Sequence, residues 1–271
     1  MTGASREALT AARERLDALT DSTSVDAAKL ADELAAVTAL LDREAGLRRV
    51  LTDPAQPGDA KATLVQRLLG GQIGGETVDL VAGIVRSRWS QSRDLVDALE
   101  ELANLADLTA AQRTGTLDDV EDELFRFGRI ISSSSELRSA LTDRAAGTSA
   151  KVELLHRLLG GRAKPTTERL VTRLVTAPRG RSLETGLESL SKLAADRRNR
   201  MVAVVTTAVP LSDRQKQRLG AALAKLYGRQ MHLNIDVDPE LIGGIRVQVG
   251  DETINGSLAD RLEDAARRMA S

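Results

Sequence analysis

The chain contains an internal repeat, which constrains its fold more than any other feature of the sequence. When the sequence is shifted by ninety positions, residues 47–85 lie over residues 137–175 without a gap, and 18 of the 39 aligned positions are identical. The identities include polar residues and glycines as well as leucines, for example at Gly70-Gly71 and Gly160-Gly161. Two unrelated amphipathic helices would share leucines but not these positions. The repeat therefore indicates two copies of one compact module.

Each copy is predicted to be a bundle of helices. Apolar residues recur three and four positions apart, which places them on one face of a helix. This spacing predicts helices around residues 30–41, 64–68, 78–85 and 95–106 in the first copy, and around residues 120–131, 154–158, 170–174 and 183–193 in the second. Each Gly-Gly pair follows one of these helices, where a left-handed turn is expected to end it.

One helix is expected to belong to both bundles. A further amphipathic helix, at about residues 6–19, precedes the first copy, and the ninety-residue shift places it over a helix at about residues 95–108. The helix near residues 91–112 is therefore expected to close the first bundle and to open the second. We predict residues 1–108 as the domain of the first copy and residues 109–195 as the domain of the second.

The hydrophobic pattern changes near Arg200, which predicts a third domain over residues 196–271. Residues 201–209 are rich in β-branched residues, and two later segments alternate polar and apolar residues as half-buried strands do. Helices are predicted from Ser212, which has capping-box spacing to Gln215, and over residues 257–269. The predicted fold class is mainly α, with two consecutive helical-bundle modules followed by a small α/β domain.

The composition argues against several classes of protein. Lys and Arg together number 38 and Asp and Glu 39, and the chain has one Trp, one Tyr and two Phe, so it lacks the basic excess and the aromatic platforms of nucleic-acid binders. The absence of cysteine excludes disulfides, zinc–thiolate sites and thiol nucleophiles. No apolar run approaches the about 20 residues of a spanning helix, which predicts a soluble chain without direct membrane insertion.

No group of residues in the sequence indicates an active site. The glycine spacings of phosphate-binding loops and dinucleotide-binding turns are missing. His156 and His232 lie in different predicted domains, and His156 aligns with Gln66 of the first copy. Residues 132–135 form a polar turn without a nearby histidine, and the carboxylates are dispersed over helix faces. The sequence therefore predicts a protein that is not an enzyme and that binds no metal or cofactor.

The most specific motif lies near the C-terminus. Residues 236–251 read Asp-Val-Asp-Pro-Glu-Leu-Ile-Gly-Gly-Ile-Arg-Val-Gln-Val-Gly-Asp, and Ile-Asn-Gly-Ser follows at residues 254–257. This part resembles the delta subunit of F-type ATP synthase, the family of the mitochondrial oligomycin sensitivity-conferring protein. The residues that carry the resemblance, as structural or partner-binding positions, are Val237, Asp238, Leu241, Ile242, Gly243, Gly244, Val247, Gly250, Gly256 and Ser257. The chain departs from the family in having two helical copies instead of one, and Asn255 where Asp is common.

The resemblance implies a non-catalytic peripheral-stalk (stator) subunit. Such a subunit would link the N-terminal helices of the alpha subunits in the catalytic head to the b-type stalk subunits, and would resist rotor torque during proton-driven ATP synthesis. One copy per complex would lie peripherally at the cytoplasmic face of the bacterial plasma membrane, held there through the ATP synthase complex. The alternative is a helical-repeat scaffold that binds peptides and is unrelated to ATP synthase.

The two copies differ at the helix near residues 120–131 and its equivalent. The second copy has four bulky residues, Phe125, Phe127, Ile130 and Ile131, where the first has Ala35, Val37, Leu40 and Leu41. A groove for an amphipathic helix needs apolar anchors of this kind, and core packing is the competing interpretation. We hypothesise that these four residues line the tighter alpha-helix groove and that the first copy is an added brace.

Overall fold

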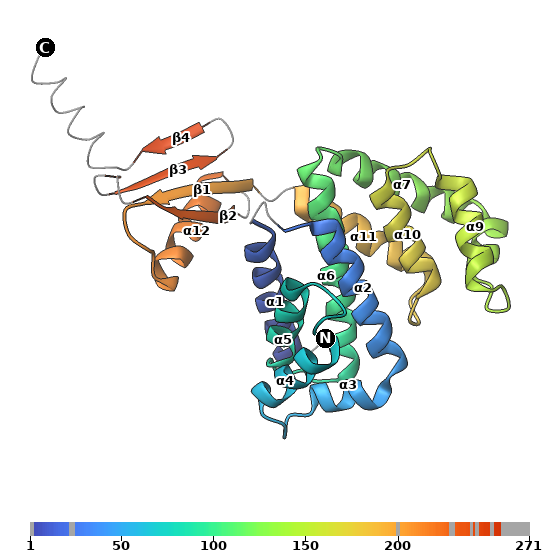
Figure 1. Cartoon of the computed structure of the whole chain (residues 1–271). Coiled ribbons are helices and arrows are strands. Elements are labelled where there is room, and N and C mark those ends of the chain that lie inside the picture. The colour runs from blue at the N-terminus through green and yellow to red at the C-terminus, as the bar shows by residue number, and fades with distance from the viewer. Residues whose placement is uncertain are drawn as a thin grey trace, which may run out of the picture. The chain divides into compact units, whose positions relative to one another are not determined.

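The computed structural model describes residues 3–21, 25–198, 201–227, 231–238, 241, 244–249 and 252–255. The chain divides into two compact units, a helical unit of residues 1–197 and a C-terminal unit of residues 198–271. The predicted fold class, mainly α with a small α/β part, is confirmed (Figure 1). None of the helices in these ranges is long and apolar enough to cross a membrane.

The first copy is a bundle of α-helices. Its helices are α1 (Gly3–Asp21), α2 (Ala27–Arg43), α3 (Ala45–Thr52), α4 (Gly58–Leu69), α5 (Gly75–Val85) and α6 (Ser92–Arg113). The apolar stripes identified in the sequence face the core, as at Leu30, Leu34 and Leu41, which are at most 2% exposed. Asp26 begins α2 by accepting hydrogen bonds from two backbone N–H groups of its first turn.

The second copy repeats the helices of the first at the spacing found in the sequence. It consists of α7 (Leu117–Ser133), α8 (Ser135–Thr142), α9 (Thr148–Leu159), α10 (Pro165–Thr176) and α11 (Leu183–Arg198). The first and last residues of α7, α8 and α9 lie ninety positions after those of α2, α3 and α4. The internal repeat of the sequence is therefore a repeat of structure. The helices predicted from the apolar spacing are present in both copies.

The same polar contact holds α5 in the first copy and its equivalent, α10, in the second. In the first copy, the carboxylate of Glu33 on α2 accepts hydrogen bonds from the backbone N–H of Gly74 (3.0 Å) and from the hydroxyl of Thr77. In the second copy, Glu123 on α7 accepts the equivalent pair at the start of α10. The first N–H groups of a helix have no partner within the helix. A glutamate from a neighbouring helix supplies one in each copy.

The Gly-Gly pairs end α4 and α9 as the sequence predicted. The second glycine of each pair is left-handed, with φ 75° at Gly71 and φ 70° at Gly161. A residue with a Cβ rarely adopts this conformation, whereas glycine adopts it without strain. The chain can therefore reverse directly after each helix.

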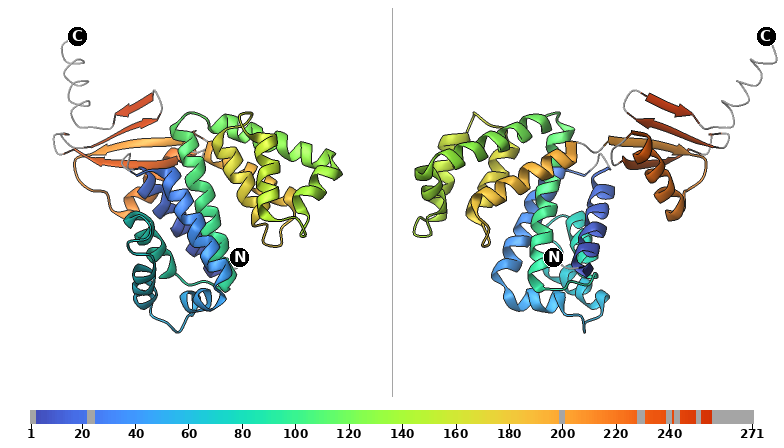
Figure 2. Two further views of the ribbon diagram at one scale, coloured as in Figure 1. Left: turned by 45° about the vertical axis from the view of Figure 1, so that its right-hand side comes forward. Right: turned by 180° about the vertical axis from the view of Figure 1, so that it is seen from behind.

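Helix α6 lies in both hydrophobic cores. Its residues from Leu95 to Ala106 belong to the core of the first copy, and Leu108 and Ala111 belong to the core of the second. Most of its side chains are buried, including Leu99 and Leu102 at 0% exposure. Figure 2 shows α6 running alongside α2, with one end leading into the helices of the second copy. Helix α6 therefore joins the two cores.

The C-terminal unit is a four-stranded sheet with one described helix. Its elements are β1 (Met201–Thr207), α12 (Asp213–Tyr227), β2 (Met231–Val237), β3 (Ile245–Val249) and β4 (Glu252–Asn255). The strand order is β2-β1-β3-β4, with β1 parallel to β2 and β3 antiparallel to both of its neighbours. The capping box is confirmed, because Gln215 accepts a hydrogen bond from the backbone N–H of Ser212 (2.8 Å). The helix predicted over residues 257–269 lies outside the described residues.

Candidate partner-binding site

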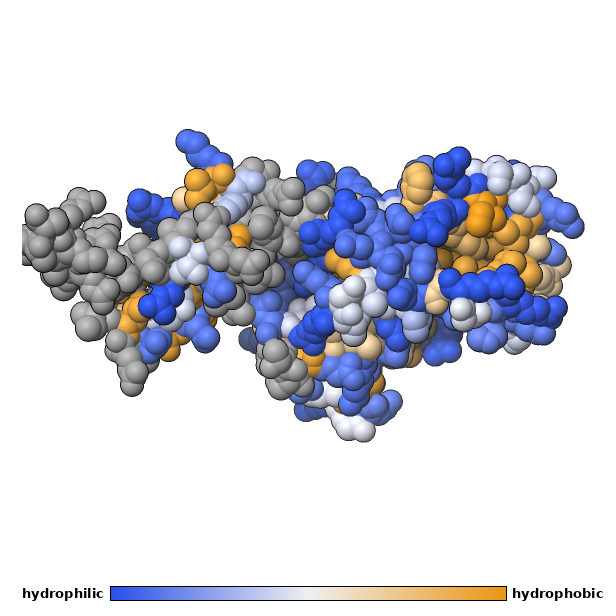
Figure 3. Space-filling model, turned by 90° about the horizontal axis from the view of Figure 1, so that it is seen from above, coloured by the Kyte–Doolittle hydropathy of each residue, from blue (hydrophilic) through white to orange (hydrophobic). Residues whose placement is uncertain are grey.

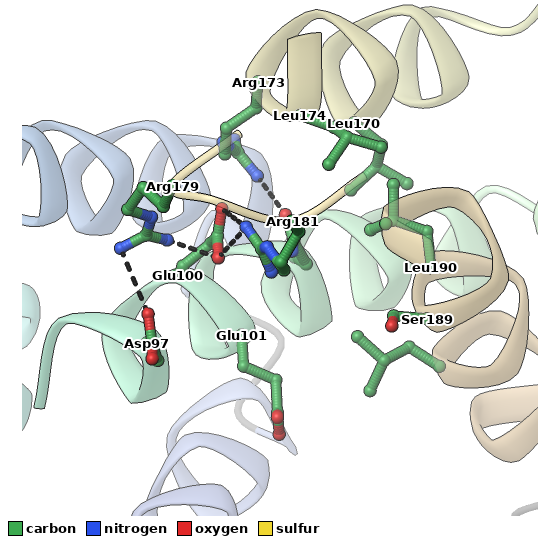
Figure 4. Close-up of a pocket in the computed structure, with 13 residues that line it drawn as sticks. Asp97, Glu100, Glu101, Leu170, Arg173, Leu174, Arg179, Arg181, Ser189 and Leu190 are labelled. Atoms are coloured by element: carbon green, nitrogen blue, oxygen red, sulfur yellow. Dashed lines mark hydrogen bonds and ion pairs between the residues drawn. The ribbon is translucent and has the colours of Figure 1, made fainter. Parts of the chain in front are cut away.

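A buried network of ion pairs fixes the α10–α11 connection to α6 (Figure 4). Glu100 of α6 forms ion pairs with Arg179 and Arg181, and Nη2 of Arg181 lies 2.6 Å and 2.7 Å from its two carboxylate oxygens. Arg179 is buried and left-handed, with φ 48°. A non-glycine residue in this conformation costs roughly 1–2 kcal/mol. The ion pair with Glu100 offsets this strain.

A second set of ion pairs joins α10 to α6. Asp107 is fully buried, and its carboxylate oxygens lie 2.6 Å from Nη2 of Arg169 and 2.9 Å from Nη2 of Arg173. Burial raises the pKa of Asp107, and the two arginines lower it in part. Burial likewise raises the pKa of Asp97, which lies 3.7 Å from Arg179. Asp97 lines a cavity of about 230 Å³. Because both carboxylates are paired with arginines, we infer that they hold the helices together.

The two histidines lie in different units of the chain. Nδ1 of His156 lies 2.7 Å from the carboxylate of Glu168 on the surface of the second copy. His232 belongs to β2 in the C-terminal unit. Within the described ranges, no group of three or more His, Asp or Glu side chains is arranged to hold a metal ion. The apolar grooves of the helical unit are the remaining candidates for a site.

The structure divides the four residues of the predicted groove into two pairs. Phe127 and Ile131 are buried in the core of the second copy, at 4% and 0% exposure. Phe125 and Ile130 lie on the surface, at 60% and 50% exposure. The prediction that all four line a groove is therefore wrong for Phe127 and Ile131, because these two point from α7 into the bundle. Core packing is the correct interpretation of that pair.

A groove of about 550 Å³ runs between α7 and α11. Its apolar lining comes from Leu124, Phe125 and Leu187, and Gly128 leaves the α7 side open. The polar residues that line it are Arg129, Ser132, Ser133, Glu184, Glu188 and Ser191. Figure 3 shows apolar residues gathered on the surface of the second copy. The second copy therefore offers an apolar groove with a polar rim, and the exposed Phe125 is part of it.

At the equivalent place in the first copy, α2 packs closely along α6. Ala31 of α2 and Val96 of α6 are both fully buried in the core of the first copy. The equivalent of Ala31, ninety positions later, is Glu121 of α7. The leucines of α6 and α11 align at an offset of 88, and at that offset the equivalent of Val96 is Glu184 of α11. Burying the carboxylate of Glu184 between two packed helices would cost several kcal/mol. The charge of Glu184 therefore disfavours close packing of α7 against α11.

The first copy has a groove of its own, of about 460 Å³, between α1 and α5. Its lining residues are Arg15, Leu19, Gly75, Glu76, Asp79 and Leu80. The positions equivalent to Arg15, Leu19 and Leu80 in the second copy are Leu105, Thr109 and Leu170, and all three are buried. The α1–α5 groove of the first copy therefore lies at a place where the second copy is closed.

Some motif residues of the C-terminal unit lie on its surface, and others lie in its core or at a turn. Val237 and Asp238 are exposed at the end of β2, and Leu241 is partly buried. Gly244 is left-handed, with φ 90°, directly before β3, and Val247 is buried in the core of the unit. Gly244 and Val247 thus shape the fold. Five further residues of the motif, Ile242, Gly243, Gly250, Gly256 and Ser257, lie outside the described residues.

Comparisons with known proteins agree on one family. The model of the ATP synthase delta (OSCP) subunit family matches residues 105–269. ATP synthase subunit delta of Streptomyces coelicolor is 82% identical over 271 residues, which cover 100% of this chain and 99% of that protein. The proteins of the same name from Acidothermus cellulolyticus and Thermobifida fusca are 50% and 47% identical, and each match covers 100% of both chains.

The matches differ in how they treat the two copies. The family model begins at residue 105, within α6, so it covers the second copy and the C-terminal unit. The full-length relatives also cover the first copy. A chain of the Toxoplasma gondii mitochondrial ATP synthase hexamer matches 63% of this chain and 97% of its own length, at 25% identity and a TM-score of 0.30. That TM-score is too low to equate the two folds.

Proposed function

The chain belongs to the ATP synthase delta (OSCP) subunit family, and we propose that it is a non-catalytic peripheral-stalk subunit of an F-type ATP synthase. The helical unit binds the N-terminal helices of alpha subunits in the catalytic head, and the C-terminal unit binds the b-type stalk subunits. The subunit holds the head against rotor torque during proton-driven ATP synthesis, at the cytoplasmic face of the bacterial plasma membrane. The observation that carries this proposal is the family match, which full-length relatives extend over the whole chain.

The construction of the helical unit supports a role in transmitting force. A stator must not deform between its binding surfaces, and closely packed protein interiors have low compressibility. Helix α6 is buried in both cores, and the ion pairs of Asp107 and Glu100 add cross-links from α10 and from the α10–α11 connection. A torque applied to one copy would therefore be passed to the other through α6.

We assign the alpha-helix site to the second copy and the bracing role to the first. The open α7–α11 groove with the exposed Phe125 supports this assignment, as does the family match to the part of the chain that contains the second copy. The α1–α5 groove of the first copy favours a second candidate, in which the first copy binds the alpha helix. The two candidates make opposite predictions for variants that fill one groove.

Two glycines provide a matched pair of groove-filling variants. A Cβ at Gly75 has no atom within 4 Å, and a Cβ at Gly128 would lie 4.0 Å from that of Leu187, so both positions admit a side chain. A peptide of the alpha-subunit N-terminus from the same organism is titrated against the full-length chain and both variants. Gly128→Leu is expected to weaken binding at least about ten-fold and Gly75→Leu to leave it unchanged. The reverse result would assign the site to the first copy.

A pull-down tests the class of function. The tagged full-length chain is expressed in its own organism and recovered from solubilised membranes. We expect alpha, beta and b-type subunits to co-purify in stoichiometric amounts. A peptide-binding scaffold unrelated to ATP synthase would recover none of the three, and this result would reject the proposed function.

A further inference from the structure

We propose that the α7–α11 groove binds an amphipathic partner helix in one direction only, selected by Arg129 on one wall and Glu188 on the other. The partner is a helix with an apolar stripe, an acidic residue on the flank that meets α7 and a basic residue on the flank that meets α11. The inference deepens the proposed function, because it specifies the chemistry of the groove that the proposal assigns to the head.

The shape of the groove fits a helix. It lies between two helices and has an apolar floor, formed by Leu124 and Leu187, which are at most 1% exposed. Phe125 stands at its edge as an exposed aromatic anchor. The lining runs along α7 from Leu124 to Ser133, about 14 Å at 1.5 Å per residue. A groove of this kind takes two to three turns of an amphipathic helix, whose apolar face covers the floor.

The charges of the two walls are opposite and available. Glu184 on the α11 wall is already paired with Arg138 at 3.0 Å. A backbone hydrogen bond lowers the pKa of Glu184, and the hydrogen bond from Arg138 lowers it further. Arg129 on α7 and Glu188 on α11 line the same groove, and neither forms an ion pair or side-chain hydrogen bond within the described part of the chain. A docked helix can therefore pair with both.

Opposite charges on the two walls determine the direction of the bound helix. When a helix lies with its apolar face on the floor, reversing its direction exchanges its two flanks between the walls. In one direction an acidic flank meets Arg129 and a basic flank meets Glu188, and in the other direction both contacts are repulsive. Charge complementarity of this kind sets orientation and register more than overall affinity.

The first copy does not have this pair of charges. The equivalent of Arg129 is Ala39. The equivalent of Glu188, at the offset of 88 that aligns α6 with α11, is Glu100, which is buried and paired with Arg179. The direction-selecting groove is therefore a property of the second copy, and it distinguishes the surfaces that the two copies present.

The absence of cysteine in the chain allows a direct test of direction. Ser132, an exposed residue near one end of the groove, is replaced by Cys in the full-length chain. Two designed 18-residue peptides carry the same leucine stripe, and the positions of Glu and Lys on the flanks are exchanged between them. Each is made with a cysteine at either its N- or its C-terminus, and disulfide formation with Ser132→Cys is measured.

Each peptide is expected to cross-link through one terminus at least about five-fold more than through the other, and the two peptides should prefer opposite termini. Adding Arg129→Glu with Glu188→Arg, which preserves the net charge, should reverse both preferences. Adding Asp122→Arg with Arg126→Glu, an exposed pair on α7 that does not line the groove, should change neither.

Equal cross-linking through both termini would overturn the inference, and so would a preference that the exchange at Arg129 and Glu188 leaves unchanged. Both failures are separable from failure of the proposed function, because the alpha peptide could still lose affinity in Gly128→Leu. A chain that dimerises on its own, and becomes monomeric in Gly128→Leu, would show that a second copy of the chain occupies the groove. That result would also overturn the inference.

Discussion

Nη1 of Arg197 on α11 lies 2.7 Å from Oδ1 of Asp17 on α1, so the last helix of the second copy is ion-paired to the first helix of the first copy. The two side chains are only 11% and 9% exposed. The equivalent of Asp17 in the second copy is Asp107, which pairs with Arg173. The aspartate at this position of the repeat thus pairs with an arginine in both copies. In the first copy, this ion pair connects the two bundles.

Removing the charge of Asp17 should therefore destabilise the helical unit. Asp17→Asn leaves Arg197 largely buried without its counter-ion, and we expect a loss of about 2 kcal/mol in the free energy of unfolding. The matched control is Asp122→Asn, because Asp122 pairs with Arg126 at about 70% exposure, where such pairs contribute less than about 0.5 kcal/mol. Urea unfolding followed by circular dichroism measures both, and equal losses would contradict the prediction.

Asp107 should make stability depend on pH in the direction opposite to that of an ordinary ion-paired aspartate. Burial raises its pKa above the usual 3.8, and Arg173 and Arg169 lower it only in part. The folded state therefore binds the proton more tightly, and this contribution to stability is fully present below pH 3.8 and is lost as pH rises through the folded pKa. The free energy of unfolding of the chain minus that of Asp107→Asn should decrease across this window. Urea unfolding at successive pH values measures it, and an increase with pH would refute the assignment.

The long helices could be predicted from sequence because the apolar spacing directly reflects which face is buried. The eight-residue helices α3 and α8 were missed. Each has two turns and buries one leucine, Leu51 or Leu141, so no periodicity develops. The four-residue strand β4 was missed for the same reason. The repeat gives partial information about these two segments, because it aligns residues of α3 with residues of α8 even though the apolar spacing predicts no helix there.

The site was predicted less completely than the fold. The aromatic character of α7 was visible in the sequence, but Phe125 and Phe127 are two residues apart and point to different sides of a helix. The groove is open because α7 does not pack closely against α11. The sequence feature that indicates this is the charged Glu184, where the first copy has Val96. The ion pair of Glu100 with Arg179 joins residues far apart in sequence, and no local pattern predicts it.

The first glycine of each Gly-Gly pair should be as necessary for the stability of the fold as the second. A Cβ at Gly160 would lie 2.5 Å from the carbonyl oxygen of His156, a backbone atom that cannot move without disturbing α9. We expect Gly160→Ala to lower the free energy of unfolding by about 1–3 kcal/mol. Gly46→Ala in α3, where nothing lies within 4 Å, is the control and should be neutral or slightly stabilising. Thermal unfolding compares the two, and the prediction fails if Gly160→Ala is as stable as the control.

The two copies should unfold together, because α6 belongs to both cores. Trp89, the one tryptophan, is buried in the first copy and donates a hydrogen bond to the carbonyl oxygen of Ile84 (3.2 Å), so its fluorescence reports on that copy. Leu124→Ala in the core of the second copy is expected to cost about 2–5 kcal/mol. It should move the Trp89 transition to lower urea, because loss of the second core exposes the C-terminal turns of α6. Leu223→Ala, in the core of the C-terminal unit, should leave that transition in place. If Leu124→Ala also left it in place, the copies would unfold independently, and α6 could not pass force from one to the other.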